Sequence, residues 1–498
     1  MTLIFSGNSF KYQLEAVCKL FLPVETFDFM FLDGKNDAMM DRPEGDYCFI
    51  CRIEGVKNSM LSVYVKMGAR AAMDKCKIPI DTPNYDADCE FELSKLLFNC
   101  LVKLTGKRPE WGVLTGVRPV KLINKLRSSG MNYDEILNKL TCDCCVTEEK
   151  VKVGYDTAVN QDRIVSAMPK KSFSLYVSIP FCPTRCSYCS FISQTVQSFK
   201  KLMPEYVDKL CEEIKFTAEL VKGSGFTLDT VYFGGGTPTS IEAEQLCRIM
   251  QTVNQSFDLS DIREYTVEAG RPDTITPEKL AVIKENGGDR VSINPQTIHD
   301  SVLEAIGRKH TYAQFCDSYK LARSVGFKAV NVDLIAGLPT DTIEGFKQTM
   351  ESIIALQPEN ITVHTLSIKR ASDLMSKYTK EDGEAAKEMV AYASKRLYES
   401  GYQPYYLYRQ KNQLDNQENI GWTKPGFAGI YNINIMEEVQ SIVAVGAGAT
   451  SKIINGCFER FFNPKYPLEY IKHFDTVLER KRAAAKLLND YKGGEESK

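Results

Sequence analysis

The chain has 498 residues, which is too long for one ordinary domain and predicts two or three. Hydrophobic residues make up 43% of it and charged residues 25%, a balance typical of a protein that buries a large core. Lysine and arginine (62) nearly cancel aspartate and glutamate (64), leaving a net charge of −2. This balance argues against a protein that coats nucleic acid or a membrane surface.

The cysteine content indicates the compartment. Sixteen cysteines are far fewer than a disulfide scaffold of this length would carry. The first residues, MTLIFSGNSF, lack the basic and long apolar regions of a signal peptide, and no apolar stretch approaches the roughly 20 residues that cross a membrane. We therefore expect a cytoplasmic protein without a membrane span, in which the cysteines are reduced and some of them have another purpose.

Residues 1–165 are predicted to form an α+β domain of unknown role. A short apolar strand at 61–66 is accompanied by helical patterns over 90–104 and 147–166. A Cys-Asp-Cys-Cys run at 142–145 fits no common cluster loop, and we interpret its thiols as free.

Between residues 172 and 375, short β-branched or aromatic runs alternate with amphipathic helical patterns such as Met203–Val221. This alternation predicts βαβ units and a parallel sheet. The six expected strands are 174–179, 230–233, 264–268, 290–294, 329–335 and 360–366. The pattern alone is consistent with an open doubly wound sheet and with a full or partial βα barrel.

The last part, 376–498, is predicted to be an α/β extension that covers the substrate side. It begins with a helical pattern at 383–400, continues through a Gly- and aromatic-rich stretch, and ends in a charged tail at 493–498 that we expect to be disordered.

Three cysteines stand together directly after the first expected strand: Cys182, Cys186 and Cys189. Three thiolates in one short loop can face a common point, which suits an iron–sulfur cluster. A structural zinc site normally needs four protein ligands, and no fourth Cys or His lies nearby in the sequence. Three ligands on four irons would leave one iron open to a substrate.

This CxxxCxxC loop resembles the signature of the radical S-adenosylmethionine (SAM) superfamily. The resemblance implies a partial (βα)6 barrel of the TIM type, with its chemistry at the carboxyl ends of the strands. It also implies a [4Fe–4S] cluster held by the three cysteines and SAM bound at the open iron, where reduction releases a 5′-deoxyadenosyl radical.

Further positions resemble SAM contacts of the coproporphyrinogen dehydrogenase group. Glycines allow backbone to approach a ligand closely, and a buried carboxylate needs a partner. The implied cofactor residues are Tyr176, Gly235, Gly236, Thr237, Glu268, Gln296, Arg308 and Asp333. Tyr176 is also counted, with the cluster cysteines, as catalytic.

From about residue 175 to 425 the chain resembles oxygen-independent coproporphyrinogen III oxidase and its relatives, through Leu175–Cys182 and Val332–Pro339. Val267–Asp273, Tyr406–Lys411 and the amino-terminal Trp111–Pro119 match the HemZ-type branch. The resemblance implies an oxidoreductase of porphyrin biosynthesis, which converts two propionates of coproporphyrinogen III to vinyl groups and yields protoporphyrinogen IX.

Three departures from the family pattern keep alternatives open. Ser178 and Phe191 stand where the well-studied dehydrogenases have a His and a fourth Cys. The heme chaperone branch carries a His-Asn motif, whereas this chain has Glu418 before Asn419, so the axial iron ligand of that motif is missing. The alternatives are a radical SAM methyltransferase or ring-opening enzyme acting on a tetrapyrrole, and a heme chaperone without turnover.

A substrate with four carboxylates calls for basic partners. The candidates are Arg185, Arg370, Arg409 and Lys411. The resemblance further implies a reductant such as flavodoxin or ferredoxin, and we expect a monomer that binds no nucleic acid.

Overall fold

The computed structural model describes residues 1–23, 25–32, 44–116, 118–189, 194–368, 380–410 and 413–490. The chain divides into two compact units. The first comprises Met1–Tyr155 and Arg409–Gln417, and the second comprises Asp156–Tyr408 and Glu418–Lys498. The division lies between Tyr155 and Asp156, inside the continuous helix α5 (Glu148–Ser166), whereas the sequence predicts a boundary near residue 165. An unbroken helical pattern gives no sign of a boundary within it. The charged tail predicted at 493–498 lies outside the described residues.

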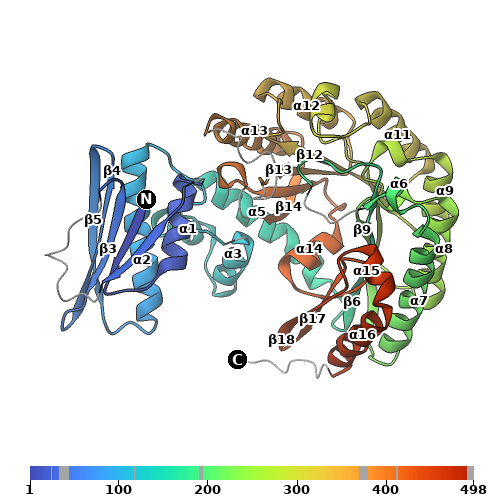
Figure 1. The fold of residues 1–498 in the computed structure, drawn as a ribbon, viewed down its shortest axis with the longest axis horizontal. Helices are drawn as coiled ribbons and strands as arrows, with labels where there is room; N and C mark the ends of the chain where they lie inside the picture. Colours follow the sequence, from blue (N-terminus) through green and yellow to red (C-terminus); the bar gives the residue numbers. More distant parts are fainter. Residues whose placement is uncertain are drawn as a thin grey trace. The chain divides into compact units, whose positions relative to one another are not determined.

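The first unit is built on a mixed five-stranded sheet with the order β2-β1-β3-β4-β5 (Figure 1). Alternate residues of β4, among them Leu61, Val63 and Val65, are buried, and the Cys100 thiol of α2 lies 3.8 Å from the carbonyl oxygen of Val63. Helix α2 therefore covers this face of the sheet. The strands are β1 (Thr2–Ser6), β2 (Asp28–Leu32), β3 (Tyr47–Ile53), β4 (Asn58–Met67) and β5 (Arg70–Pro79). The helices are α1 (Lys11–Phe21), α2 (Tyr85–Thr105), α3 (Pro119–Ser128) and α4 (Tyr133–Cys142).

The second unit contains the six parallel strands that the sequence predicts, paired in chain order. They are β6 (Ser172–Ile179), β9 (Thr227–Gly235), β10 (Glu264–Glu268), β11 (Arg290–Ser292), β12 (Ala329–Ala336) and β13 (Asn360–Thr365). The helices between them are α7 (Met203–Val221), α8 (Ala243–Ser256), α9 (Pro277–Glu285), α10 (Asp300–Ala305), α11 (Tyr312–Val325) and α12 (Ile343–Ala355). Figure 1 shows α7, α8, α9, α11 and α12 along the outside of the curved sheet. The partial (βα)6 barrel is therefore confirmed.

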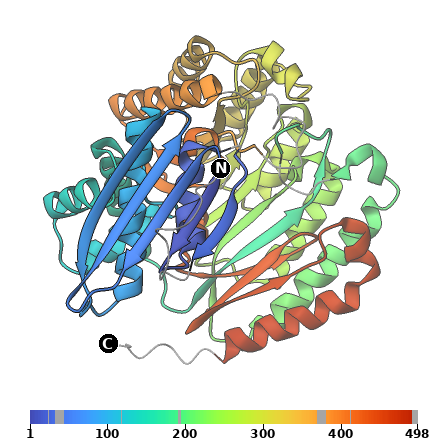
Figure 2. The ribbon, with the colours of Figure 1, turned by 60° about the vertical axis from the view of Figure 1, so that its left-hand side comes forward.

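The carboxyl-terminal residues complete this same sheet at both of its edges and do not form a separate extension. Strands β15 (Asn419–Thr423) and β14 (Gln403–Tyr408) continue it antiparallel beyond β13. On the other side, β16 (Ser441–Val445) runs parallel to β6, followed by β17 (Thr450–Asn455) and β18 (Cys457–Phe462), as the orange and red strands of Figure 2 show. Unpaired edge strands expose backbone donors and acceptors, so this pairing satisfies both edges of the barrel.

The remaining helices of the second unit pack around these strands. They are α6 (Val196–Phe199), α13 (Lys380–Glu399), α14 (Ile430–Glu437), α15 (Pro467–Lys472) and α16 (Phe474–Asn489). Helix α13 packs on α12, and α16 packs on α7. Among the residues that the structure describes, none of the helices combines the length and apolar character needed to cross a membrane.

Helix α14 lies inside the curve of the sheet and is fixed at the amino ends of the strands (Figure 1). The carboxylate of Glu264, at the start of β10, accepts hydrogen bonds from the backbone N–H groups of Ile430 (2.6 Å) and Tyr431 (3.3 Å). A carboxylate at a helix amino terminus satisfies free N–H groups and is favoured by the helix dipole. Arg290, at the start of β11, donates to the carbonyl oxygen of Phe427 just before this helix (3.0 Å). The amino end of the barrel is thereby filled, and the carboxyl end is left for a site.

Candidate active site

The loop that carries the three cysteines starts at the carboxyl end of β6. Cys182 ends the short strand β7 (Phe181–Cys182), which pairs with β8 (Gln194–Thr195). The backbone N–H of Thr237 donates to the carbonyl oxygen of Phe181 (2.8 Å), and the Thr237 hydroxyl lies 3.5 Å from the Cys182 sulfur. The segment after β9 is thus joined directly to the start of the cysteine loop.

The glycines at the end of β9 are explained by this close approach. A Cβ atom at Gly236 would lie 2.5 Å from the Phe181 carbonyl oxygen, and one at Gly235, where φ is +109°, would lie 3.0 Å from the Ser178 hydroxyl. Side chains at either position would separate the two loops. Backbone packing onto the cysteine loop is therefore one reason for glycine here, and the SAM contact predicted for Gly235, Gly236 and Thr237 stays a prediction.

The three thiols occupy one loop with graded exposure. Cys186 is buried, whereas Cys182 and Cys189 are partly exposed. Within the described ranges, no three His, Cys, Asp or Glu side chains converge as ligands of a single metal ion. Each cysteine of an iron–sulfur cluster binds a different iron, so its sulfurs do not need to converge in this way. The loop's chemistry fits the predicted cluster better than it fits a zinc ion.

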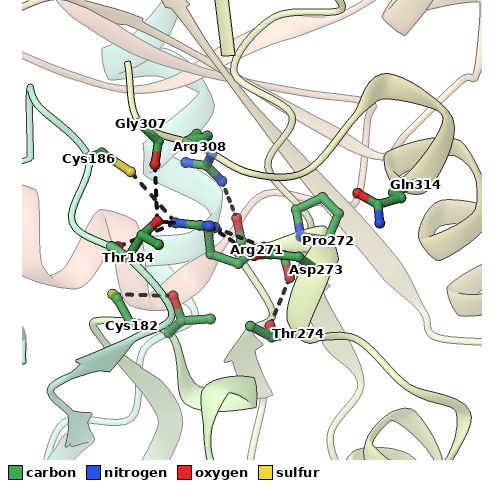
Figure 3. A network of polar contacts seen from close by, with 12 residues as sticks. Cys182, Thr184, Cys186, Arg271, Pro272, Asp273, Thr274, Gly307, Arg308 and Gln314 are labelled. Carbon is green, nitrogen blue, oxygen red and sulfur yellow. Dashed lines mark hydrogen bonds and ion pairs between the residues drawn. The ribbon is translucent and has the colours of Figure 1, made fainter. Parts of the chain in front are cut away.

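Arg271, on the loop after β10, supports the cysteine loop (Figure 3). Its Nη1 lies 3.8 Å from the Cys186 sulfur and donates to the hydroxyl of Thr184 (3.2 Å). Its Nε and Nη2 each donate to one carboxylate oxygen of Asp273, at 2.9 Å. The sequence analysis missed this arginine, although it belongs to the quoted segment Val267–Asp273, because nothing in that segment indicates contact with a loop more than 80 residues earlier.

Arg308 supports the same loop from a second direction. It donates to the hydroxyl of Tyr188 (3.0 Å) and to the carbonyl oxygens of Gly270 (2.7 Å) and Asn294 (2.9 Å). Its Nε is buried and has no hydrogen-bond partner among the described residues. Arg308 therefore links the cysteine loop to the loops after β10 and β11, and it keeps one donor for the SAM contact that the sequence predicts.

Two carboxylates belong to strands β10 and β12, which flank β11 in the sheet. Glu268 ends β10 and accepts a hydrogen bond from the Tyr232 hydroxyl (2.6 Å). Burial raises the pKa of Glu268 to about 7; the Tyr232 hydrogen bond opposes the rise, and the charge of Asp333 adds to it.

Asp333, within β12, is held in the ionised form. Asn294 and Asn331 each donate to its carboxylate at 2.7 Å, and the imidazole of His364 lies 3.8 Å away. Burial alone would raise the pKa of Asp333, but its hydrogen bonds and the neighbouring His364 outweigh burial and hold it below its usual value. Glu268 therefore changes its protonation state near neutral pH, whereas Asp333 stays negatively charged.

Gln296 lies just after β11 and has a backbone conformation that is rare for residues other than glycine. Its φ is +69°, and its backbone bridges to Leu334, with the N–H donating to the carbonyl oxygen of Asp333 (3.1 Å). Its side-chain oxygen Oε1 is buried without a hydrogen-bond partner in the described part of the chain. A buried acceptor without a partner is costly, and a bound ligand with a free donor would remove the cost. Gln296, Arg308 and the two carboxylates therefore fit a ligand that carries hydroxyl and amino groups, as SAM does.

Tyr176 belongs to a stack of three tyrosines in the barrel interior. Its ring lies 6.2 Å from that of Tyr232 and 6.1 Å from that of Tyr431, and the Tyr232 and Tyr431 rings are 4.3 Å apart. Burial, followed by the charge of Glu268, raises the pKa of Tyr176, so its hydroxyl remains protonated. The stack joins α14 to the floor of the site and positions Tyr176 and Tyr232 below Glu268.

Ser178, near the end of β6, is tied to a turn from the carboxyl-terminal part. The Ser178 hydroxyl donates to the carbonyl oxygen of Ala447 (2.7 Å), and the Ser178 carbonyl oxygen accepts from the Tyr206 hydroxyl (3.0 Å). A Cβ at Gly446 would lie 2.5 Å from that same carbonyl oxygen. The Gly446–Ala447 turn therefore packs tightly beneath the cysteine loop.

The four basic substrate candidates have different positions. Arg185 is exposed on the cysteine loop between Cys182 and Cys186. Arg370 and Lys411 lie outside the described residues. Arg409 belongs to the first unit, where it is 6% exposed, donates to the carbonyl oxygens of Leu114 and Asn416, and lies over the Trp111 ring. These contacts engage two of the guanidinium nitrogens within the first unit, and the assignment of Arg409 to substrate stays a prediction.

Several polar residues of the site escaped the sequence analysis. Asn294, Asn331 and His364 arrange the Asp333 carboxylate, and Asp273 orients Arg271. For Asn294 and His364 the signal available in the sequence was their position near the carboxyl ends of expected strands, where barrel enzymes place functional groups.

Comparison with known proteins places this geometry in context. The sequence profile of the radical SAM superfamily matches residues 176–353. The chain is 42% identical over 401 residues to the oxygen-independent coproporphyrinogen-III oxidase-like protein HemZ of Bacillus subtilis, a match that covers 78% of this chain and 79% of that protein.

Heme chaperones are also similar to this chain. HemW of Bacillus subtilis is 36% identical over 197 residues, which cover 39% of this chain and 51% of that protein. HemW of Lactococcus lactis is 30% identical over 57% of this chain and 70% of that protein.

Among solved structures, the coproporphyrinogen III oxidase HemN of Escherichia coli, described as a radical SAM enzyme, superposes with a TM-score of 0.51. The match has 22% sequence identity and covers 67% of this chain and 79% of that chain. At this identity the similarity concerns the fold.

Proposed function

We propose that this chain, which belongs to the radical SAM superfamily and within it to the family of HemZ-like, coproporphyrinogen-III-oxidase-like proteins, oxidatively decarboxylates a porphyrinogen, most simply coproporphyrinogen III to protoporphyrinogen IX. The cofactors of the family, a [4Fe–4S] cluster and SAM, are those of this chain. The observation that supports the proposal best is the link from the cysteine loop through Arg308 to Asn294 and Asp333.

Each residue has a distinct task in this proposal. Cys182, Cys186 and Cys189 would hold the cluster, which supplies the electron that cleaves SAM to a 5′-deoxyadenosyl radical. Glu268 and Asp333 would accept hydrogen bonds from SAM hydroxyl or amino groups, and Gln296 Oε1 would accept another. The tyrosine stack would line the site beside Glu268 and would limit the access of water, which protects a reactive species from quenching.

The substrate side of the proposal rests on charge. Four carboxylates require basic partners, and arginine binds them in a forked geometry. Arg185 is exposed beside two of the cluster cysteines and is the described candidate closest to them in the chain. Decarboxylation also leaves one electron on the product, which an external acceptor must take up.

Anaerobic reconstitution tests the proposal. With iron, sulfide, SAM and a reductant, the chain is expected to form 5′-deoxyadenosine, and with coproporphyrinogen III to yield products lighter by one and then two formic acid equivalents, as seen by mass spectrometry. SAM cleavage without a vinyl product would contradict the proposal and would favour a radical methyltransferase or ring-opening enzyme.

A heme chaperone is the second candidate, because HemW proteins are among the relatives. The stretch that replaces the His-Asn motif weakens it: Glu418 is 1% exposed, its carbonyl oxygen accepts from the Thr365 hydroxyl (2.7 Å), and Asn419 accepts from the Thr365 N–H (2.9 Å). This stretch is a buried strand and offers no axial ligand. Stoichiometric heme binding without SAM cleavage would establish the chaperone and exclude the enzyme.

The raised pKa of Glu268 predicts how SAM binding depends on pH. Because this pKa is about 7, the side chain is mainly neutral at pH 6 and mainly ionised at pH 8. If the carboxylate accepts hydrogen bonds from SAM, affinity falls by up to about tenfold per pH unit below 7. Equilibrium SAM binding to wild-type protein and to Glu268→Gln, measured from pH 6 to 8, checks this.

The expected profile in Glu268→Gln is weaker binding with little dependence on pH. Asp333 and His364 face the same space, so a pH dependence that persists unchanged in Glu268→Gln would assign it to them and contradict the role of Glu268.

A further inference from the structure

We propose that the ion pair of the buried Arg271 with Asp273 is a positioning element that holds the cysteine loop and tunes the reduction potential of its cluster. This proposal rests on the cluster site proposed above and concerns the residues that contact its cysteine loop. Figure 3 shows Arg271, on the loop after β10, reaching from its partner Asp273 toward Thr184 and Cys186 of the cysteine loop.

The Arg271 guanidinium is shielded from solvent beside the cysteine loop. The side chain of Arg271 is 4% exposed and that of Asp273 is 19% exposed, so the guanidinium acts in a medium of low polarity. Arg271 reaches the loop at three atoms: the Cys186 sulfur (3.8 Å), the Thr184 hydroxyl (3.2 Å) and the Thr184 carbonyl oxygen (3.4 Å). These contacts fix the segment between the first two cysteines.

The same segment of the cysteine loop is held on its other side by backbone carbonyl groups. The Thr184 hydroxyl donates to the carbonyl oxygen of Gly307 (3.0 Å), and the Ser187 N–H donates to that of Ile306 (3.1 Å). Arg271 therefore supplies the side-chain half of a two-sided clamp, which orders the loop before any cluster binds.

The charges of Arg271 and Asp273 bear on the reduction potential. Hydrogen bonds to sulfur and nearby charge both set the potential of an iron–sulfur cluster, because each stabilises the added electron of the reduced state. Asp273 takes two of the Arg271 donors in a bidentate pair and balances its charge. The pair thus offers Cys186 a directed hydrogen bond with little net charge.

This charge balance predicts opposite effects for the two partners. Arg271→Gln removes the cation and its donor to sulfur and leaves Asp273 as an unpaired anion, so the midpoint potential should fall. Asp273→Asn leaves an uncompensated guanidinium beside the cluster, so the potential should rise. A role limited to packing would give no such pair of opposite shifts.

The chain provides a matched control in Arg263 and Asp229. Arg263 makes the same bidentate contact with the buried carboxylate of Asp229 (2.5 and 2.7 Å), but at the amino end of the sheet. Arg263→Gln should lower stability while leaving the potential unchanged, which separates a local effect on the cluster from general destabilisation.

The experiment is a redox titration of the reconstituted full-length chain, in which the electron paramagnetic resonance signal of the reduced cluster is measured at each potential. Wild type, Arg271→Gln, Asp273→Asn and Arg263→Gln are compared at equal iron content. Opposite shifts for the first two variants support the proposal. Unchanged potentials, or shifts in one direction for both, would overturn the tuning role. Absence of a cluster in wild type would instead overturn the proposed function.

A second measurement needs no cluster and covers a variant that fails to bind one. Arg185 is exposed within the loop, so trypsin can report how well the loop is held. In the cluster-free protein, cleavage after Arg185 should be faster in Arg271→Gln than in wild type and in Arg271→Lys, which keeps a cation. Mass spectrometry of the fragments measures the rate of cleavage. Equal rates in the wild type, Arg271→Gln and Arg271→Lys would overturn the positioning role.

Discussion

Replacing Cys182, Cys186 or Cys189 with alanine is expected to abolish both the cluster and the cleavage of SAM. The loop has three thiolates, and the predicted cluster needs all of them. Within the described part of the chain, no group of His, Cys, Asp or Glu side chains is arranged to replace a lost ligand. Loss of one thiolate therefore leaves the cluster with too few ligands. Iron and sulfide content, the visible absorption of the cluster and 5′-deoxyadenosine formation measure the effect.

The control is Cys247→Ser on α8, where the thiol lies 3.8 Å from the Asn286 amide and a hydroxyl can replace it. This variant should keep full iron content and full SAM cleavage. A normal cluster in any of the three alanine variants would contradict the assignment of the loop.

The second large effect concerns Glu213, a fully buried carboxylate on α7. It accepts hydrogen bonds from the Gly446 N–H (2.7 Å), the Tyr470 hydroxyl (2.7 Å) and the Asn463 amide (2.8 Å), and it pairs with Lys481 at 3.1 Å. Glu213→Gln leaves the buried Lys481 ammonium without a counter-charge. Breaking a buried pair in this way costs about 3–5 kcal/mol of unfolding free energy.

Denaturant unfolding of the cluster-free protein measures this loss. Removing both charges in Glu213→Gln/Lys481→Met should restore part of the stability, because no charge then remains buried without a partner. The exposed pair of Arg396 and Glu351 is the control: Glu351→Gln should cost less than about 1 kcal/mol. Equal losses at both sites would show that Glu213 is not the buried anchor inferred here.

Glu213 also matters for the site. Its hydrogen bond to Gly446 holds the turn whose Ala447 carbonyl oxygen accepts from Ser178. Since Ser178 stands directly before the cysteine loop, destabilising the turn should also reduce the fraction of protein that takes up a cluster. The stability of the barrel and the order of the site are thereby coupled through one buried carboxylate.

Local sequence pattern determined a large part of this fold. The period of apolar residues predicted Met203–Val221 and the structure has the same helix, while all six expected strands appear at their expected positions. Such patterns are local, because the side chains of a helix or strand record which face is buried. The cysteine spacing likewise indicated the chemistry, since ligand type and spacing are properties of a short segment.

Tertiary structure alone decided which distant segments meet. Arg271 contacts Cys186, Arg308 contacts Tyr188, and Arg409 is occupied within the first unit, yet no sequence period distinguishes these three arginines. The same holds for the carboxyl-terminal strands, which the sequence placed in a separate extension and which instead complete both edges of the barrel sheet.

The physical reason is the range of the interactions. Periodicity acts within one segment, so the amino-acid pattern was enough to predict helices such as Met203–Val221 and the six barrel strands, and the spacing of the three cysteines predicts a cluster loop. The partners of the arginines, the sheet edges that β14 to β18 extend and the raised pKa of Glu268 became visible only in the folded chain, because strand pairing and the burial that shifts a pKa depend on segments far apart in the sequence.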